Sequence, residues 1–319
     1  MHVKPPSTHE SAAARLVHDR APLYAQRSAV RLSDREIDRD LTVDDYAGHL
    51  LLTDYGSGLS RDFLRSVAAA FADALGQIGR TVNSASVKAR PDDLAHRGVR
   101  QTSAPKLLLG DPPPDRFAVA EDDLLLGVSF VDAGFATGLF LDMVEGRRLV
   151  RRLAGEHGQV LNLFSYTGAF SIAAAKGGAQ QVIEVDTSRK WLGWSQNNQR
   201  LNDVMGHGIV RQRCEDAVRL LGKQPDASFD LVISDPPSYA NPKRGKRFTV
   251  EAGYRQMAGD FERVVRPGGR LLACCNHAGT GRGQVLSWLP KAFKLEQWVH
   301  APPDFANADY LKVALLRRK

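Results

Sequence analysis

The sequence has few cysteines and no long apolar run. Among its 319 residues only Cys214, Cys274 and Cys275 are cysteines, too few for a disulfide framework in a chain of this length. No CxxC pair or Cys/His spacing typical of a zinc site occurs, so we expect no bound metal. No stretch of about 20 apolar residues is present, which predicts no membrane span and no membrane partner.

The N-terminus also lacks the apolar segment of a signal peptide. Charges and prolines interrupt the first 20 residues. Together with the unpaired cysteines, this predicts a reducing, cytoplasmic location. The composition is 43% apolar and 25% charged, which is typical of a globular protein and excludes a wholly disordered chain.

Positive charge is concentrated in the last quarter of the chain. Residues 242–319 contain 15 Lys and Arg against 6 Asp and Glu, a net charge of +9. The whole chain has 43 against 36, so residues 1–241 have 28 against 30, a net charge of −2. This distribution favours a local patch for an anionic partner over a generally cationic surface. A solvated basic face with no partner is the alternative.

Hydrophobic patterning divides the chain into three parts. Residues 1–40 show no sustained period, and we expect an extension. Residues 41–135 combine strand-like pieces with a helix that begins after Ser60, which predicts a small α+β domain. In residues 136–319, short apolar strands alternate with helices, which predicts an α/β fold with a Rossmann-like, doubly wound parallel sheet.

A cofactor site is expected where the first strand of that sheet, 159–164, ends. The turn that follows contains Gly168 alone and no G-x-G-x-x-G, which argues against a dinucleotide and for a smaller cofactor without phosphates. Asp186 follows Gly168 by 186 − 168 = 18 residues, at the end of the second strand, where a carboxylate can accept both ribose hydroxyls. Asp216, after the third strand, could accept from an adenine amino group. Alone, each acid reads as a helix cap or surface charge; together they indicate an adenosine pocket.

Several separate blocks carry a family resemblance. LNLFSYTGAF, EVDTSRKWLGWSQNN and FDLVISDPPSYANPKRGKRF resemble the class I large-subunit ribosomal RNA methyltransferases, whose cofactor is S-adenosylmethionine. The nearest groups are the 5-methylcytosine and the guanine N7 enzymes. The blocks DLTVDDYAGHLLL and DYLKVALLRR are similar to the start of the middle domain and the last strand of these enzymes, so the resemblance covers about residues 40–319. It implies an enzyme that binds RNA, with ribosomal RNA as substrate.

The resemblance also implies which residues surround the cofactor. These are Phe140, Asp142, Arg147, Asn162, Phe164, Ser165, Thr167, Gly168, Asp186, Asp216, Asp235 and Pro236. Two departures stand out. Val144 occupies a position where the family has an arginine, and residues 1–40 are too short for the PUA RNA-binding domain with which many cytosine-specific members begin.

A candidate chemistry site follows the fourth strand, at Asp235-Pro236-Pro237-Ser238-Tyr239. Two successive prolines stiffen the loop. In the relatives this loop holds the target base, which implies Tyr239 as a stacking face and Asp235 as a hydrogen-bond acceptor or base. Pro237 and Ser238 would contact substrate. The four cations that follow predict a clamp for backbone phosphates: Lys243, Arg244, Lys246 and Arg247. A solvated loop is the alternative interpretation.

The fifth strand ends in two cysteines. Carbon-5 of a pyrimidine is a weak nucleophile, and enzymes activate it by adding a thiolate at carbon-6. Cys275-Asn276 resembles the Ser-Cys-Asn motif of RNA 5-methyluridine enzymes, whereas the guanine N7 relatives have Asn-Asn and no thiol. Adjacent strand residues point to opposite faces, so we interpret Cys274 as core. The C-terminal glutamate base of the uridine enzymes has no counterpart, which favours cytosine over uracil.

The sequence therefore predicts a ribosomal RNA cytosine-C5 methyltransferase in which Cys275, Asp235 and Tyr239 are catalytic. The first alternative is a guanine N7 or amino-nitrogen methyltransferase without a nucleophile. The second is an RNA-binding homologue whose cofactor site has decayed, as Val144 and the missing PUA domain suggest. An NAD-dependent oxidoreductase is disfavoured by the missing glycines. The sequence leaves the oligomeric state open, monomer or homodimer.

Overall fold

The computed structural model describes residues 8–56, 58–90, 104–132, 136–155, 158–205, 208–240 and 248–319. The chain divides into two compact units. The N-terminal unit comprises Met1–Leu141 with Pro303–Ala306, and the C-terminal unit comprises Asp142–Pro302 with Asn307–Lys319. Among the described residues, no helix has both the length and the apolar character needed to cross a membrane.

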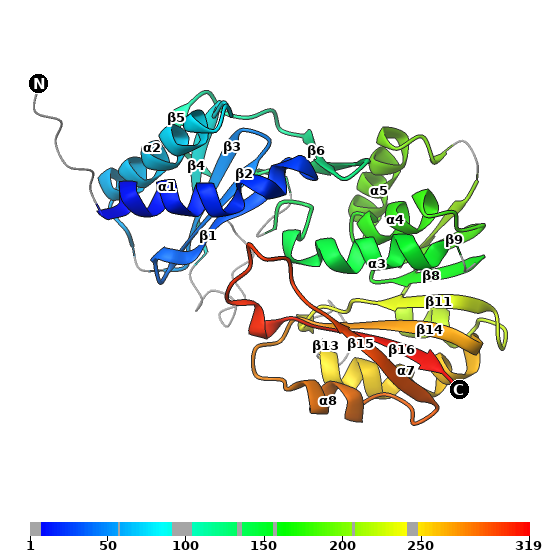
Figure 1. The fold of residues 1–319 in the computed structure, drawn as a ribbon. Coiled ribbons are helices and arrows are strands. Elements are labelled where there is room, and N and C mark those ends of the chain that lie inside the picture. The colour runs from blue at the N-terminus through cyan, green and yellow to red at the C-terminus, as the bar shows by residue number, and fades with distance from the viewer. Residues whose placement is uncertain are drawn as a thin grey trace, which may run out of the picture. The chain divides into compact units, whose positions relative to one another are not determined.

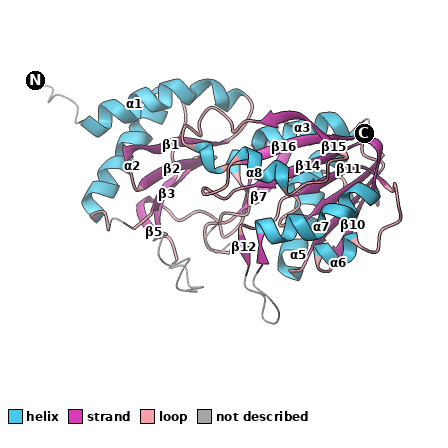
Figure 2. Ribbon diagram, turned by 90° about the horizontal axis from the view of Figure 1, so that it is seen from below, coloured by secondary structure: helices cyan, strands magenta, loops and turns pink. Residues whose placement is uncertain are grey.

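The N-terminal unit is built on a five-stranded sheet. Its strands, in spatial order, are β1 (Ala29–Asp38), β2 (Leu41–Tyr46), β3 (His49–Asp54), β4 (Ser84–Ala89) and β5 (Lys106–Gly110). All neighbours are antiparallel except β3 and β4, which are joined through a crossover helix. A separate hairpin consists of β6 (Phe117–Glu121) and β7 (Leu124–Val128). Helices α1 (Thr8–Arg20) and α2 (Arg61–Gln77) form one hydrophobic core with this sheet (Figure 2).

Helix α2 confirms the sequence prediction. Ser60 is its N-cap, and the Ser60 hydroxyl accepts a hydrogen bond from the Phe63 backbone N–H. The buried face of the helix includes Val67, Phe71 and Leu75. These residues recur every four positions, so one apolar stripe meets the sheet.

The expectation that residues 1–40 form an extension is wrong for the described residues from Thr8 onward. Helix α1 buries Leu16 and Val17, and β1 forms one edge of the sheet. The sequence pattern was hidden because the polar residues of β1 are paired inside the unit instead of alternating toward solvent. Arg31, for example, forms ion pairs with Asp34 and Asp44, both of which are buried.

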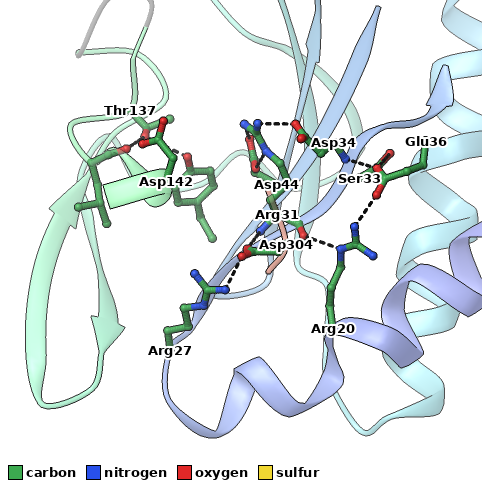
Figure 3. A network of polar contacts seen from close by, with 12 residues as sticks. Arg20, Arg27, Arg31, Ser33, Asp34, Glu36, Asp44, Thr137, Asp142 and Asp304 are labelled. Carbon is green, nitrogen blue, oxygen red and sulfur yellow. Dashed lines mark hydrogen bonds and ion pairs between the residues drawn. The ribbon is translucent and has the colours of Figure 1, made fainter. Parts of the chain in front are cut away.

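A segment from near the C-terminus completes the N-terminal unit. The Arg27 Nη2 atom lies 2.6 Å from Asp304 Oδ1, and both side chains are almost fully buried. The backbone N–H of Arg31 donates to the other oxygen of Asp304 at 2.9 Å (Figure 3). The Arg31 guanidinium also lies over the Phe305 ring, 4.3 Å from its centroid. These contacts anchor Pro303–Ala306 in the N-terminal unit.

The C-terminal unit contains a seven-stranded sheet. Its strands, in spatial order, are β10 (Val210–Cys214), β9 (Gln181–Asp186), β8 (Gln159–Leu163), β11 (Phe229–Ser234), β14 (Val265–Cys275), β16 (Lys312–Arg318) and β15 (Phe293–Val299). The first five are parallel, whereas β16 runs antiparallel to both of its neighbours. A two-stranded ribbon, β12 (Tyr239–Ala240) with β13 (Phe248–Thr249), follows β11.

Helices cover both faces of this sheet. Figure 1 shows α3 (Val144–Ala154), α4 (Ala169–Lys176) and α5 (Arg189–Leu201) on one side. On the other side, α6 (Ala217–Leu221), α7 (Val250–Val264) and α8 (Arg282–Ser287) share a core with the strands. This is the predicted Rossmann-like, doubly wound α/β fold. Its parallel strands bring the carboxyl ends of β8, β9, β10, β11 and β14 to one edge, where such folds bind ligands.

The buried Arg27–Asp304 pair predicts a stability effect. Replacing Asp304→Ala leaves the Arg27 charge buried without its partner, which should lower the free energy of unfolding by about 3 kcal/mol. Denaturant unfolding measures this difference. The matched control is Arg39→Ala, which breaks the ion pair of Arg39 with Asp40; because the Arg39 side chain is 92% exposed, we expect a change below about 0.5 kcal/mol. Equal effects of the two substitutions would contradict the anchoring role of Asp304.

Candidate functional site

The turn after β8 is tightly wound. Phe164 and Tyr166 have φ angles of 58° and 51°, which non-glycine residues rarely adopt, and Gly168 has a φ of 79°. The Gly168 N–H donates to the Ser165 carbonyl, and the Tyr166 N–H donates to Asp186 Oδ2 at 3.0 Å. The predicted turn and the predicted acidic residue are therefore directly joined, although 20 residues separate Tyr166 from Asp186. Such strained backbone is characteristic of functional sites.

The missing side chain of Gly168 makes room for a neighbouring helix. In the structure, a Cβ at Gly168 would lie 2.1 Å from the Ser195 hydroxyl oxygen of α5. The glycine therefore lets α5 close against the turn. Asn198, one helical turn after Ser195, donates to the Thr167 carbonyl at 2.9 Å and holds the turn from the same helix.

A buried carboxyl group supports this turn, and sequence reasoning missed it. Glu184, in β9, is fully buried and accepts hydrogen bonds from Ser195 at 2.7 Å and from Gln212 at 2.5 Å. Burial raises the pKa of the Glu184 carboxyl, and its hydrogen bonds offset part of that rise. The available signal was a single charged residue inside the otherwise apolar strand QVIEVD.

The two predicted adenosine-binding acids have different surroundings. Asp186 is partly buried at the end of β9, where it also accepts from the Ser188 N–H at 2.8 Å, and burial raises its pKa. Beside its backbone donors, the carboxylate retains capacity to accept from a hydroxyl group. Asp216 is exposed and is the N-cap of α6, accepting from the Arg219 N–H at 2.9 Å. The helix-cap interpretation is therefore confirmed for Asp216, and its contact with a cofactor stays a prediction.

Two buried polar atoms of the β8 edge have no hydrogen-bond partner among the described residues. They are Asn162 Oδ1 and Ser165 Oγ. Asn162 Nδ2 donates to Ser171 of α4 at 2.9 Å, which fixes the orientation of the amide. Buried polar groups are nearly always paired in native proteins. These two atoms therefore indicate a ligand or ordered water that carries hydrogen-bonding groups.

A second polar group lies where β11 ends. Burial raises the pKa of the Asp235 carboxyl to about 7; the Asp142 carboxylate adds to this rise and the Arg147 guanidinium opposes it. Arg147 is only 2% exposed, and Tyr310 donates to Asp142 at 2.8 Å. Three of the predicted cofactor residues, Asp142, Arg147 and Asp235, thus interact electrostatically within one unit.

Val144, the departure from the family pattern, is fully buried in α3. The position where the resemblance expects an arginine therefore belongs to the core of this unit. Phe140, by contrast, is 44% exposed and belongs to the N-terminal unit.

Both cysteines at the end of β14 are fully buried. Cys274 thereby fits its interpretation as a core residue. Cys275 also packs in the hydrophobic core, on the face covered by α7 and α8. Burial raises the pKa of the Cys275 thiol, although the backbone N–H of His277 and the Lys312 ammonium oppose that rise. A buried, protonated thiol is a poor nucleophile. The catalytic role of Cys275 stays a prediction, and its surroundings weigh against it.

The Asp-Pro-Pro-Ser loop is described only in part. Pro236 is buried and Pro237 exposed, while the Ser238 hydroxyl donates to Asn276 Oδ1. The Tyr239 side chain lies outside the described residues, as do the four predicted cations Lys243, Arg244, Lys246 and Arg247. Within the described ranges, no group of three or more His, Cys, Asp or Glu side chains is placed to hold a metal ion.

The fold and site together define a class of protein that binds a nucleoside cofactor. Five parallel strands end at one edge, a turn without a phosphate-binding glycine pattern follows β8, and an acid, Asp186, ends β9. A family model described as S-adenosylmethionine-dependent methyltransferase matches residues 19–317, and the chain belongs to this family. It is therefore an enzyme whose cofactor is S-adenosylmethionine. The unpartnered Asn162 and Ser165 atoms and the Asp186 carboxylate fit the amino and hydroxyl groups of that cofactor.

Solved structures share the fold. SMU.776, a protein assigned as a methyltransferase and crystallised with S-adenosylhomocysteine, has a TM-score of 0.79 at 24% identity, over 98% of this chain and 83% of that chain. A methyltransferase from Agrobacterium tumefaciens has a TM-score of 0.65 at 16% identity, over 92% and 90%. The tRNA m1G37 methyltransferase of M. jannaschii has a TM-score of 0.59 at 12% identity, over 100% and 80%.

The support of the β8 turn by Glu184 predicts an effect on cofactor binding. In Glu184→Gln, the new amide NH2 group faces the donors of Ser195 and Gln212, so the turn loses part of its support. We expect affinity for S-adenosylmethionine, measured by calorimetry, to fall about tenfold. Glu215→Gln is the matched control, because Glu215 pairs with Lys223 outside the turn and should bind the cofactor normally. Unchanged affinity in Glu184→Gln would refute the supporting role.

Proposed function

We propose that this enzyme methylates a nitrogen atom of a nucleobase in RNA, with ribosomal RNA as the substrate. The choice of nitrogen as the methylated atom rests on the properties of Asp235. Its carboxyl group has a pKa of about 7 and directly precedes the Pro236-Pro237 pair at the end of β11. A general base with a pKa near the working pH is suited to accept a proton from a base N–H.

Three observations support RNA as the substrate. The net charge of +9 in residues 242–319 would attract a phosphate backbone. The blocks around 161–170 and 229–248 resemble ribosomal RNA methyltransferases. The M. jannaschii protein of similar fold is named as a tRNA m1G37 methyltransferase, so the fold of this chain is compatible with an RNA substrate.

The proposed reaction needs few groups from the protein. When bound, the cofactor would supply the methyl group from its sulfonium and would leave as the neutral thioether. Asp235, as the carboxylate, accepts a hydrogen bond from the target N–H and orients the nitrogen lone pair toward that methyl group. Asp235 would take the proton that the methylated nitrogen loses, so charge and atoms balance.

The remaining site residues have proposed roles in binding. Asp186 would hold the ribose hydroxyls, Asp216 the adenine amino group, and Tyr239 would stack on a flipped base. Within the C-terminal unit, the rest of the cofactor pocket would comprise Asp142, Arg147, Asn162, Phe164, Ser165, Thr167, Gly168 and Pro236. On the substrate side, Pro237 and Ser238 would contact the base, and Lys243, Arg244, Lys246 and Arg247 would contact phosphates.

Methylation at cytosine C5 is the second candidate. Cys275 ends the fifth parallel strand, β14, and Cys275-Asn276 resembles the Ser-Cys-Asn motif of the RNA 5-methyluridine enzymes, which favours a thiol mechanism. That route needs the Cys275 thiolate to add to carbon-6 of the base. Full burial and a raised pKa oppose both the ionisation and the approach of the thiol, so we favour an acceptor that brings its own lone pair.

Mass spectrometry of modified nucleosides tests the substrate and the acceptor atom. Ribosomal RNA from cells without the gene should lack one N-methylated nucleoside. Wild-type protein and Cys275→Ala should both restore it, whereas Asp235→Asn should not. A restored 5-methylcytidine that depends on Cys275 would establish the second candidate instead. No change in any RNA nucleoside would overturn RNA methylation.

The raised pKa of Asp235 predicts the pH dependence of methyl transfer. The carboxyl group is protonated below pH 7 and ionised above it, and only the carboxylate can accept the proton. Single-turnover rates should therefore fall about tenfold per pH unit below pH 7 and level off above it. Asp142→Asn removes the negative charge that helps to raise the pKa of Asp235, so the midpoint of the pH–rate profile should move to lower pH. A rate that is independent of pH between 5 and 8 would exclude Asp235 as the base.

A further inference from the structure

Ser238 and Asn276 meet at the edge where the parallel strands end. Ser238 lies four residues after Ser234, the last residue of β11, and Asn276 directly follows Cys275, the last residue of β14. The two strands are paired neighbours, with Ser234 opposite Ala273. Parallel neighbours bring their carboxyl ends together, so the two side chains reach the same region as Asp235.

The contact between these side chains sets the direction of the Asn276 amide. The Ser238 hydroxyl donates to Asn276 Oδ1. With its oxygen used in this way, the carboxamide presents its Nδ2 hydrogens as donors. Asn276 is also exposed, in contrast to the two fully buried cysteines before it. It is therefore the first side chain after β14 that can meet a substrate.

The residue after Asn276 is held by hydrogen bonds. The Lys312 ammonium, from β16, donates to the His277 carbonyl at 2.9 Å and to the Tyr310 carbonyl at 3.2 Å. The His277 ring is hydrogen-bonded to Thr280 at 2.9 Å. A polar group on a supported backbone loses little entropy when it binds, which is what a recognition site requires.

We propose that Asn276 is a specificity-determining residue, whose Nδ2 donates a hydrogen bond to an acceptor on the edge of the target base while Ser238 holds the amide in that orientation. The inference rests on the proposed function, because it places the base beside Asp235. The ligand is a nucleobase edge with an N–H group for Asp235 and a carbonyl oxygen or ring nitrogen for Asn276. Sites built on hydrogen bonds discriminate strongly, since a mismatched base leaves a buried polar group unpaired.

Reversing the polarity of the amide tests this role. Asn276→Asp keeps the shape but turns an oxygen toward the base acceptor, whereas Asn276→Ala only removes the donor. With RNA from cells lacking the gene and labelled S-adenosylmethionine, kcat/KM for RNA should fall about tenfold in Asn276→Ala and at least a further tenfold in Asn276→Asp. In Ser238→Ala, kcat/KM for RNA should fall severalfold, because the Asn276 amide is then free to rotate. Cofactor affinity should stay within twofold of wild type throughout.

A matched control and two outcomes decide the inference. Asn83→Asp makes the same isosteric change at an exposed position of the N-terminal unit and should leave kcat/KM unchanged. If Asn276→Asp is as active as Asn276→Ala, or if cofactor affinity falls in parallel with kcat/KM, Asn276 does not read the base. That result leaves RNA methylation standing. Absence of methyl transfer to RNA by the wild-type enzyme would instead overturn the proposed function together with this inference.

Discussion

The close packing of Ser195 against the α-carbon of Gly168 is the constraint on which the cofactor edge depends. Because no side chain intervenes, α5 can approach the turn after β8, and a Cβ there would lie 2.1 Å from the Ser195 hydroxyl oxygen. The same helix then brings Asn198 to the Thr167 carbonyl, and Ser195 to the buried Glu184. The turn is thus held by side chains from α5 and β9, which leaves the Tyr166 N–H directed at Asp186.

Burial has opposite consequences for the reactivity of the two groups that could perform chemistry. It raises the pKa of Asp235 to about 7, which brings the carboxyl group into the range of a useful base. It also raises the pKa of the Cys275 thiol, which moves that group away from the reactive thiolate. One physical cause, removal from water, therefore favours a mechanism that moves a proton over one that needs a covalent intermediate.

Sequence patterns predicted the elements whose apolar residues recur regularly. The helix after Ser60, the strand at 159–164 and the strands expected to end at Asp186 and before Asp235 are present. Helix α1 and strand β1 were missed, because Arg31 and its acidic partners make polar residues part of the interior. Glu184 was missed for the same reason. A charged residue in a strand predicts a solvent-exposed position unless its buried partners are known.

The alternation of strands and helices, the single glycine after β8 and the acid at the end of β9 were predictable from the sequence alone, because local periodicity and turn chemistry depend on near neighbours. From these followed the α/β class and the nucleoside cofactor. Only the tertiary structure decided what Gly168 accommodates, which thiols are buried and which proton acceptor is tuned toward neutral pH. Those properties depend on the packing of Gly168 against Ser195 and on the electrostatic interaction of Asp235 with Asp142, between residues far apart in the chain. Burial and charge act through space, so no local pattern encodes them.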